Sequence, residues 1–433
     1  MYFIPIMNIK VKKSKINGQI AVPGSKSHTI RGIAAALCAN GTSKLIAPLV
    51  AEDTISTLKA ATLLGAKFEN PGEIHSDWKI TGYGGPKVPG EVLNMNNSGT
   101  GTRILLATCA TCDEAVTFDG DASLRTRPMG QLLDALKQLG VRVISSKGRC
   151  PLTITGPARS GHVTVDGTSS QFLTALLFLT PRLEGETVID VVNLNEQPYV
   201  MMTLAWLDRL GVKYEMPKGN LTQFVIPGNQ AFEPLETVIP ADFSTAAFPL
   251  GAAAVTGCEL DIRNLDFSDT QGDKAVFDYF EAMGTMIDRD MSTTSTVVRG
   301  PSRLKGIDID LNATPDALPI MAVAGALAEG VTRILNVPQA RIKETDRIEC
   351  MTRELRKMGA DVEELSDGMV IKGGKLTGTE VESYGDHRIA MAMAVAALAA
   401  EGETIIRGAE AATVTYPGFL EDFRGIGADI EFA

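Results

Sequence analysis

The sequence predicts an α/β protein in which one supersecondary unit of about 70 residues is repeated six times along 433 residues. Two sets of positions carry this prediction. An aliphatic residue followed by glycine ends a helix-like apolar run and opens a strand-like segment at Gly65, Gly140, Gly211, Gly284, Gly359 and Gly427. Six very apolar segments start at Lys26, Asn97, Ser169, Asp242, Asp316 and Asp386. Both sets recur every 68 to 75 residues, which is typical of a repeat architecture.

Within each copy the pattern predicts a strand, an apolar helix, a strand, an amphipathic helix and further strands. The apolar helices are expected at residues 27–39, 98–110, 170–179, 244–254, 317–328 and 388–400. Because they are apolar nearly all round, they should be buried on most sides. Segments that are polar on one face, such as GQLLDALKQLG, should form the outside. A glycine stop follows five of the six apolar helices, which suits a left-handed cap; the second copy, at Asp113-Glu114-Ala115, lacks one.

Composition limits the classes of partner. A net charge of −11 argues against nucleic acid or an anionic membrane as a general partner, because both favour basic surfaces. Apolar runs such as IAMAMAVAALAA are too short to cross a bilayer, and the start MYFIPIMNIKVKK, with lysines after the apolar patch, indicates an edge strand rather than a secretory signal. Cys109 and Cys112 form a CxxC without a second pair, so no metal site is expected. We expect a cytoplasmic protein with reduced cysteines.

The polar residues at the apolar helix starts differ from copy to copy. A plain solenoid, in which each unit touches only its neighbours, gives no reason for such differences. A helix start presents unpaired N–H groups and the positive end of its dipole, so several starts brought together would attract anions. The pattern therefore favours closure of the repeats around one anion-binding site.

The first half supplies cations and neutral donors. PGSKSHTIR carries Lys26 and Arg31 about one helical turn apart, which suits a phosphate or carboxylate, although a solvated capped helix is the alternative. NNSGTGTR offers glycines that let a ligand approach the backbone, and GDASLRTRPMG adds Arg125 and Arg127. DGTSSQF offers neutral donors at Ser169, Ser170 and Gln171, which suit ring hydroxyls and phosphate oxygens.

The second half supplies carboxylates beside cations. Asp242 and Asp316 stand at helix starts, where capping alone would explain either one. RIKETDR, residues 341–347, is the densest charge cluster, and a salt-bridged surface helix start is its alternative explanation. GDHRIAM opens the most apolar helix with Asp386, His387 and Arg388, charges that are costly to bury unless something uses them.

Taken together and in order along the chain, these segments resemble one family. PGSKS, NSGT, RPMG, DGTSSQFLTALL, QPY, PDALPI, RIKETDR and GDHRIAM are similar to motifs of the 5-enolpyruvylshikimate-3-phosphate synthases, an enolpyruvyl transferase family. The resemblance implies transfer of the enolpyruvyl group of phosphoenolpyruvate to the 5-hydroxyl of shikimate 3-phosphate, with release of phosphate, on the pathway to aromatic amino acids. It implies no cofactor and no metal.

The resemblance also implies a two-domain, inside-out α/β barrel of six βαβαββ repeats, three per domain, with the active site between the domains. The chain should cross between lobes near Gly24 and near Ala241. One lobe would then comprise residues 1–24 with 241–433, and the other residues 25–240. We expect a monomer that closes on shikimate 3-phosphate.

The resemblance assigns residues to each substrate. Those expected to bind shikimate 3-phosphate are Ser27, Arg31, Ser169, Ser170, Gln171, Tyr199, Asp316, Gln339 and Lys343. Those expected to bind phosphoenolpyruvate are Lys26, Gly99, Arg127, Gln171, Glu344, Arg347, His387 and Arg388. The expected catalytic residues are Asp316, Glu344 and Lys26. We place Asp316 near the attacking hydroxyl as base and Glu344 near the methylene carbon as proton carrier, and the sequence leaves open which carboxylate acts in which step.

Two residues depart from the motifs of this family, and two alternative functions are weighed against it. Val414 stands where many members have a lysine that touches phosphoenolpyruvate, and Gln339 replaces an asparagine found in some members. The rival enzyme is the UDP-N-acetylglucosamine enolpyruvyl transferase, which typically uses a loop cysteine as acid, whereas GDASLRTRP contains none. A non-catalytic anion-binding scaffold is the second rival. Gly99 keeps the small residue associated with sensitivity to glyphosate, so we expect inhibition by that compound.

Overall fold

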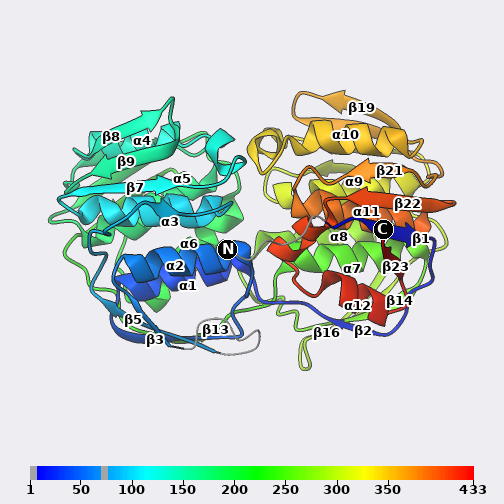
Figure 1. The fold of residues 1–433 in the computed structure, drawn as a ribbon, viewed down its shortest axis with the longest axis horizontal. Coiled ribbons are helices and arrows are strands. Elements are labelled where there is room, and N and C mark those ends of the chain that lie inside the picture. The colour runs from blue at the N-terminus through cyan, green and yellow to red at the C-terminus, as the bar shows by residue number, and fades with distance from the viewer. Residues whose placement is uncertain (1–6, 70–76) are drawn as a thin grey trace. The chain divides into compact units, whose positions relative to one another are not determined.

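The chain folds into two compact units in a computed structural model that describes residues 7–69 and 77–433. Unit 1 comprises Met1–Pro23 and Pro240–Ala433, and unit 2 comprises Gly24–Ile239. Both units mix helices and strands, so the fold is α/β (Figure 1). The apolar start of the expected N-terminal edge strand, residues 1–6, lies outside the described residues, and the strand that follows is β1 (Ile9–Lys12).

Unit 2 contains three sheets in the part of the chain that the structure describes, ordered β13-β3-β5-β4, β6-β7-β9-β8 and β10-β11-β12. The strands are β3 (Asn40–Ile46), β4 (Lys67–Glu69), β5 (Trp78–Tyr83), β6 (Leu93–Asn94), β7 (Ala115–Asp119), β8 (Arg142–Ser146), β9 (Arg149–Thr155), β10 (His162–Asp166), β11 (Thr187–Val192), β12 (Gln223–Ile226) and β13 (Glu236–Val238). The helices are α1 (Lys26–Cys38), α2 (Glu52–Leu63), α3 (Gly99–Thr108), α4 (Gly130–Gln138), α5 (Ser170–Leu179) and α6 (Gln197–Arg209), with short 3-10 turns η1 (Cys109–Thr111), η2 (Leu124–Thr126) and η3 (Thr180–Arg182).

Unit 1 contains three sheets within its described residues, ordered β15-β16-β14-β2, β17-β18-β20-β19 and β21-β22-β1-β23. Its other strands are β2 (Gln19–Ala21), β14 (Glu259–Arg263), β15 (Met286–Asp290), β16 (Ser295–Arg299), β17 (Asp308–Asp310), β18 (Val331–Leu335), β19 (Asp361–Leu365), β20 (Gly368–Lys372), β21 (Glu380–Glu382), β22 (Glu403–Arg407) and β23 (Asp429–Phe432). The helices are α7 (Phe243–Thr256), α8 (Ala275–Ala282), α9 (Leu318–Leu327), α10 (Arg347–Lys357), α11 (His387–Ala399) and α12 (Phe419–Gly425), with 3-10 turns η4 (Gly272–Lys274), η5 (Pro315–Ala317), η6 (Pro338–Ile342) and η7 (Ala409–Val414).

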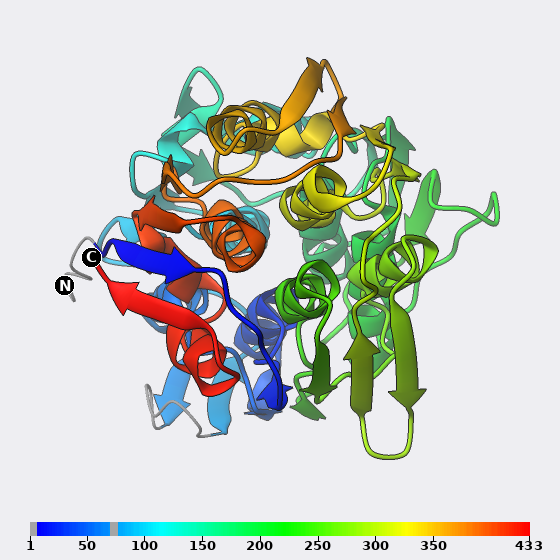
Figure 2. The same cartoon turned by 90° about the vertical axis from the view of Figure 1, so that its right-hand side faces the viewer.

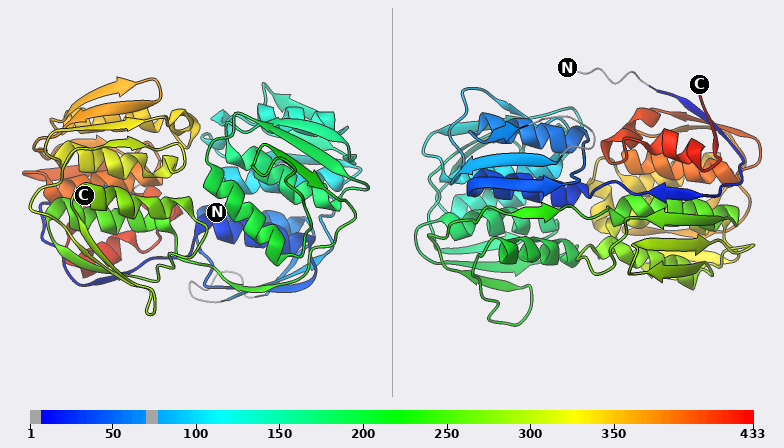
Figure 3. Two further views of the ribbon diagram at one scale, coloured as in Figure 1. Left: turned by 180° about the vertical axis from the view of Figure 1, so that it is seen from behind. Right: turned by 90° about the horizontal axis from the view of Figure 1, so that it is seen from below.

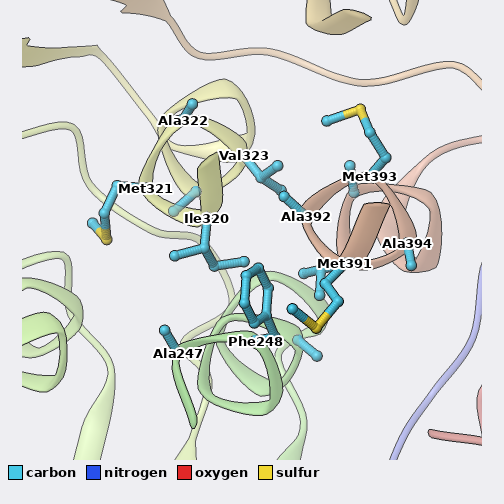
Figure 4. Close-up of a cluster of buried hydrophobic side chains, with 14 of the residues drawn as sticks. Ala247, Phe248, Ile320, Met321, Ala322, Val323, Met391, Ala392, Met393 and Ala394 are labelled. Carbon is cyan, nitrogen blue, oxygen red and sulfur yellow. The ribbon is translucent and has the colours of Figure 1, made fainter. Parts of the chain in front are cut away.

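The apolar helices form the core of each unit. In unit 1, α7, α9 and α11 pack against one another, and Figure 2 shows them nearly end-on with strands around them. Phe248, Ile320 and Met391, one from each helix, meet where the three helices come together (Figure 4). Figure 3 shows the helices of each unit from behind. Helices that are apolar on all sides are buried here because each is enclosed by its two equivalents and by sheets.

The predicted helices agree closely with the observed ones. The six apolar helices are α1, α3, α5, α7, α9 and α11. Each starts and ends within two residues of its predicted bounds. The five glycine stops have positive φ, for example 66° at Gly257, which caps α7. The second copy, which lacks such a glycine, continues from α3 into the 3-10 turn η1, as α5 continues into η3.

In each unit a short strand pairs with a strand that is far away in the sequence. β2 pairs parallel with β14, and β13 pairs parallel with β3. β1 lies between β22 and β23, so the two ends of the chain share one sheet; Figure 2 shows β1 in blue beside β23 in red. Among the described residues, none of the helices has the length and apolar character needed to span a membrane.

Candidate functional site

Arg347, the first residue of α10, is the centre of a buried charge cluster in unit 1. Its Nε and Nη2 donate to Oδ2 and Oδ1 of Asp386 at 2.8 and 3.3 Å. Its Nη1 donates to Asp316 Oδ1 at 2.8 Å, and its Nη2 donates to Glu344 Oε2 at 2.6 Å. The Arg347 side chain is 1% exposed, so these hydrogen bonds replace water around the guanidinium. The structure thus joins three carboxylates through one arginine.

Arg388, near the start of α11, makes a second contact with the same cluster. Its Nη2 lies 2.9 Å from Asp316 Oδ2 and donates to Ser244 Oγ at 2.8 Å. Asp316 belongs to the 3-10 turn η5, whose N-cap is Thr314. Asp242, by contrast, is the N-cap of α7, and its carboxylate accepts from the Thr245 N–H at 2.9 Å, so the capping explanation fits Asp242.

The neighbouring cations determine the charge of Asp316. Burial alone would raise the pKa of this carboxyl, but the positive charges of Arg388, Lys343 and Arg347 outweigh burial and hold the pKa well below its usual value. Glu344 opposes them as a nearby negative charge. Asp316 is therefore ionised at neutral pH in the protein as it stands.

Asp386 stands in the GDHRIAM segment, and the family resemblance gave it no substrate-binding or catalytic role. Its carboxylate is fully buried, caps α11 by accepting from the Arg388 N–H at 2.9 Å, and accepts from the Thr345 hydroxyl at 3.2 Å. His387 Nδ1 lies 4.0 Å from the same carboxylate. The signal that could have found Asp386 is its place at an N-cap directly before two site residues.

Gln339 and Val414 lie in 3-10 turns. Gln339, in η6, is buried and donates to the Asn312 carbonyl at 2.8 Å. Val414 ends η7, and its side chain is partly exposed. Val414 brings no charge to that turn.

In unit 2, Lys26 opens α1 after the N-cap Ser25. Its Nζ lies 3.2 Å from Asp53 Oδ2, and both side chains are largely buried. The pKa of the nearby Asp121 carboxyl is raised, chiefly by burial. The negative charge of Asp53 also raises it, whereas the positive charge of Arg127 lowers it. Lys26 and Arg127 thus belong to one charged neighbourhood.

Gly99 and Arg127 lie in contact at the start of α3. A Cβ at Gly99 would lie 2.6 Å from Nη1 of Arg127 and 3.1 Å from Nη1 of Arg103. Arg127 Nη2 donates to Asn97 Oδ1, and the Arg127 side chain is 6% exposed. Glycine therefore lets two guanidinium groups lie close to the helix start, and a larger residue here would have to displace that of Arg127.

The start of α5 brings together the neutral donors. Ser169 caps this helix by accepting from the Gln171 N–H, and Gln171 Oε1 accepts from Arg103 Nη1 at 2.5 Å. Ser170 donates from its N–H and its hydroxyl to Glu196 Oε2, at 3.1 and 2.7 Å. Sequence reasoning assigned no role to Arg103 or to Glu196, because both reach the site by contacts between distant parts of the chain.

Arg31 and Tyr199 lie together on α1 and α6. Arg31 is 1% exposed and donates to the Ser27 carbonyl, the Thr203 hydroxyl and the Tyr199 carbonyl, at 3.0, 3.0 and 3.2 Å. Burial lowers the pKa of Arg31 to about 10, and the nearby Tyr199 opposes this shift. Arg31 therefore ties α1 to α6, and Ser27 is partly exposed beside it.

No group of three or more histidine, cysteine, aspartate or glutamate side chains suited to a metal ion occurs in residues 7–69 and 77–433. Cys109 and Cys112 are both buried at the end of α3. Lys26, Arg127 and Arg103 in unit 2, and Arg347, Arg388 and Lys343 in unit 1, are instead suited to anions with phosphate and carboxylate groups.

Curated relatives resemble the chain over its whole length. A 3-phosphoshikimate 1-carboxyvinyltransferase from Acetivibrio thermocellus is 46% identical over 427 residues, which is 98% of this chain and 99% of the relative. The enzyme of the same name from Ruminiclostridium cellulolyticum is also 46% identical, over 98% of this chain and 100% of its own length. The one from Methanosarcina acetivorans is 39% identical over 98% of this chain.

Solved structures and a family model agree with these relatives. The structure of an EPSP synthase from Acinetobacter baumannii superposes with a TM-score of 0.82 at 28% identity, covering 99% of this chain and 100% of that one. The family model described as EPSP synthase (3-phosphoshikimate 1-carboxyvinyltransferase) matches residues 10–423. Coverage this complete, together with the charged clusters at the helix starts, means that the chain belongs to the EPSP synthase family.

Proposed function

We propose that the chain transfers the carboxyvinyl group of phosphoenolpyruvate to the 5-hydroxyl of shikimate 3-phosphate and releases inorganic phosphate. The observation that carries this proposal is that Arg347 holds Asp316 and Glu344 in one buried cluster. Addition of an alcohol to an enol phosphate, followed by elimination of phosphate to leave an enol ether, needs two proton transfers at different atoms. Two carboxylates in different environments suit that requirement.

In this proposal Asp316 accepts the proton of the attacking hydroxyl, and Glu344 carries a proton to the methylene carbon. The proton on the methylene carbon is lost again when phosphate leaves, so the vinyl group is restored. The low pKa of Asp316 in the unliganded protein opposes proton uptake. Anionic substrates that neutralise Arg388, Lys343 and Arg347 would raise this pKa toward the range useful for a base.

The remaining expected residues divide between the substrates. Lys26, Gly99, Arg127, Arg347, His387 and Arg388 are proposed to hold phosphoenolpyruvate, and Lys26 to stabilise the departing phosphate. Ser27, Arg31, Ser169, Ser170, Tyr199, Gln339 and Lys343 are proposed to hold shikimate 3-phosphate, with Gln171 serving both substrates. Support for this division comes from the donors themselves, because guanidinium and ammonium groups match phosphate and carboxylate, whereas hydroxyl and amide groups match a polyhydroxylated ring.

The proposal extends to the finer architecture. We infer that the six sheets and their helices are six βαβαββ repeats, three per unit, in the inside-out barrel implied by the motifs, and that both units contribute to substrate binding. A cytoplasmic location and a monomeric state remain predictions. Closure on shikimate 3-phosphate predicts a smaller radius of gyration in small-angle scattering when that ligand is added.

Phosphate release tests the proposed function. The purified chain is incubated with phosphoenolpyruvate and either shikimate 3-phosphate or UDP-N-acetylglucosamine, and inorganic phosphate is measured over time. We expect release only with shikimate 3-phosphate. Release with the nucleotide sugar alone would favour the rival transferase, and no release with either acceptor would favour a non-catalytic anion-binding scaffold.

A further inference from the structure

Glu354, on α10 two helical turns after Arg347, is a buried carboxylate outside the reaction described above. It is 0% exposed. Because seven residues complete nearly two turns of an α-helix, Arg347 and Glu354 lie on the same face of α10. Both residues of that face form hydrogen bonds with the segment 382–388, which leads from β21 into α11.

The Glu354 carboxylate accepts hydrogen bonds from that segment and from α10 itself. Oε2 accepts from the Glu382 N–H at 3.0 Å and from Lys357 Nζ at 2.8 Å. Oε1 accepts from the Tyr384 hydroxyl. Both oxygens of this buried carboxylate thus have a donor, and the bonds to Glu382 and Tyr384 join the segment to α10.

Tyr384 is itself constrained. Its backbone has φ of 56°, a left-handed conformation that is uncommon for a residue with a bulky side chain. The Arg353 guanidinium lies 5.8 Å from the centre of its ring. Burial and the hydrogen bond to Glu354 raise the pKa of Tyr384 to about 12, so the phenol remains a donor at physiological pH.

The segment is therefore attached to α10 at two points. Arg347 binds Asp386 at the start of the helix, and Glu354 binds Glu382 and Tyr384 two turns later. The start of the segment is also held by the pairing of β21 with β22 and by the Ser383 hydroxyl, which donates to the Gly408 carbonyl at 2.8 Å, and the contacts with α10 fix the turn that follows. His387 and Arg388 follow immediately, so their positions depend on both attachments.

We propose that Glu354 is a positioning residue, which together with Tyr384 holds the turn that presents His387 and Arg388 to phosphoenolpyruvate. The proposal rests on the proposed function for its kinetic consequence, but not for its structural one. Glu354 touches no reacting atom in this account. Its removal should loosen phosphoenolpyruvate binding more than it slows the chemical step.

The test uses Glu354→Gln, Tyr384→Phe and the matched control Glu363→Gln, an exposed glutamate on β19 of the same unit. Hydrogen exchange is followed by mass spectrometry on peptides that contain residues 382–390, and KM for phosphoenolpyruvate and kcat are measured on the same preparations. We expect faster exchange confined to that segment and about tenfold higher KM, with a smaller change in kcat, in Glu354→Gln and Tyr384→Phe. The control should resemble wild type.

Three results would overturn the proposal. One is unchanged exchange in the segment, and another is faster exchange with unchanged KM. The third is a general rise of exchange throughout unit 1 in both variants, which would mean that Glu354 and Tyr384 only support folding. If wild type transfers no carboxyvinyl group, the proposed function fails, while the exchange data still decide whether Glu354 holds the segment.

Discussion

Arg347 and Asp386 form a two-point ion pair in which neither side chain is more than 1% exposed. Removing one partner of a buried pair leaves the other charge without full compensation. We predict that Asp386→Asn lowers the free energy of unfolding by about 3 kcal/mol. Urea unfolding checks this, with Asp308→Asn as control, because Asp308 pairs with Arg333 at the surface. An equal effect of both substitutions would contradict the buried-pair account.

Asp316 and Glu344 are predicted to be needed for turnover. Asp316→Ala and Glu344→Gln should each lower kcat at least a hundredfold, roughly the scale of lost general acid–base catalysis. Phosphate release under saturating substrates is the measurement. Near-normal rates in both variants would remove these carboxylates from the mechanism.

The depressed pKa of Asp316 predicts how stability depends on pH. Because the folded state binds this proton less readily than the unfolded chain, whose aspartate pKa is about 3.9, the ionised group stabilises the fold above about pH 4. This contribution should be lost only as the pH falls further toward the folded pKa. Carbon-13 NMR of labelled aspartate carboxyls checks the direction. A titration step of the Asp316 signal between pH 4 and pH 7 would contradict it.

Gly99 is predicted to control binding beside Arg127. In Gly99→Ala the new methyl group must displace the Arg127 guanidinium, so KM for phosphoenolpyruvate should rise about tenfold, with weaker inhibition by glyphosate. Gly130→Ala is the matched control, because a Cβ there meets no atom within 4 Å. We expect wild type to be inhibited by glyphosate. A wild-type rate unchanged at millimolar glyphosate would show that this expectation is wrong.

Val414 is predicted to mark a missing cation. Val414→Lys should lower KM for phosphoenolpyruvate about tenfold, on the scale of one hydrogen bond to a charged group. Val414→Met, which has a long neutral side chain, separates charge from volume. Equal KM values in the two variants would mean that a charge at this position does not reach the substrate.

The sequence predicted the features that depend on local pattern. The spacing of the apolar segments predicted the six apolar helices α1, α3, α5, α7, α9 and α11, because an all-round apolar helix between glycines has few alternatives to burial. The pairing of β2 with β14 was not predictable from pattern, since a strand of three residues carries almost no periodicity.

The candidate site was predictable in the same uneven way. Lys26, Arg127, Arg347 and Arg388 were found because they stand at helix starts within charged motifs. The patterns gave no role to Glu196 and Glu354, because each binds a segment more than 20 residues away, Glu196 at Ser170 and Glu354 at Glu382. The sequence also did not predict that Arg31 is buried, since its partners Thr174 and Thr203 lie on other helices. Contacts between elements decide these cases, and single-sequence patterns do not contain them.

The most direct test is to identify the product of a single turnover. The chain is mixed with carbon-13-labelled phosphoenolpyruvate and shikimate 3-phosphate, quenched and examined by NMR. The account predicts a labelled vinyl ether on the 5-oxygen of the ring and one equivalent of inorganic phosphate. Recovery of unchanged phosphoenolpyruvate, or a label on any other oxygen, would contradict it.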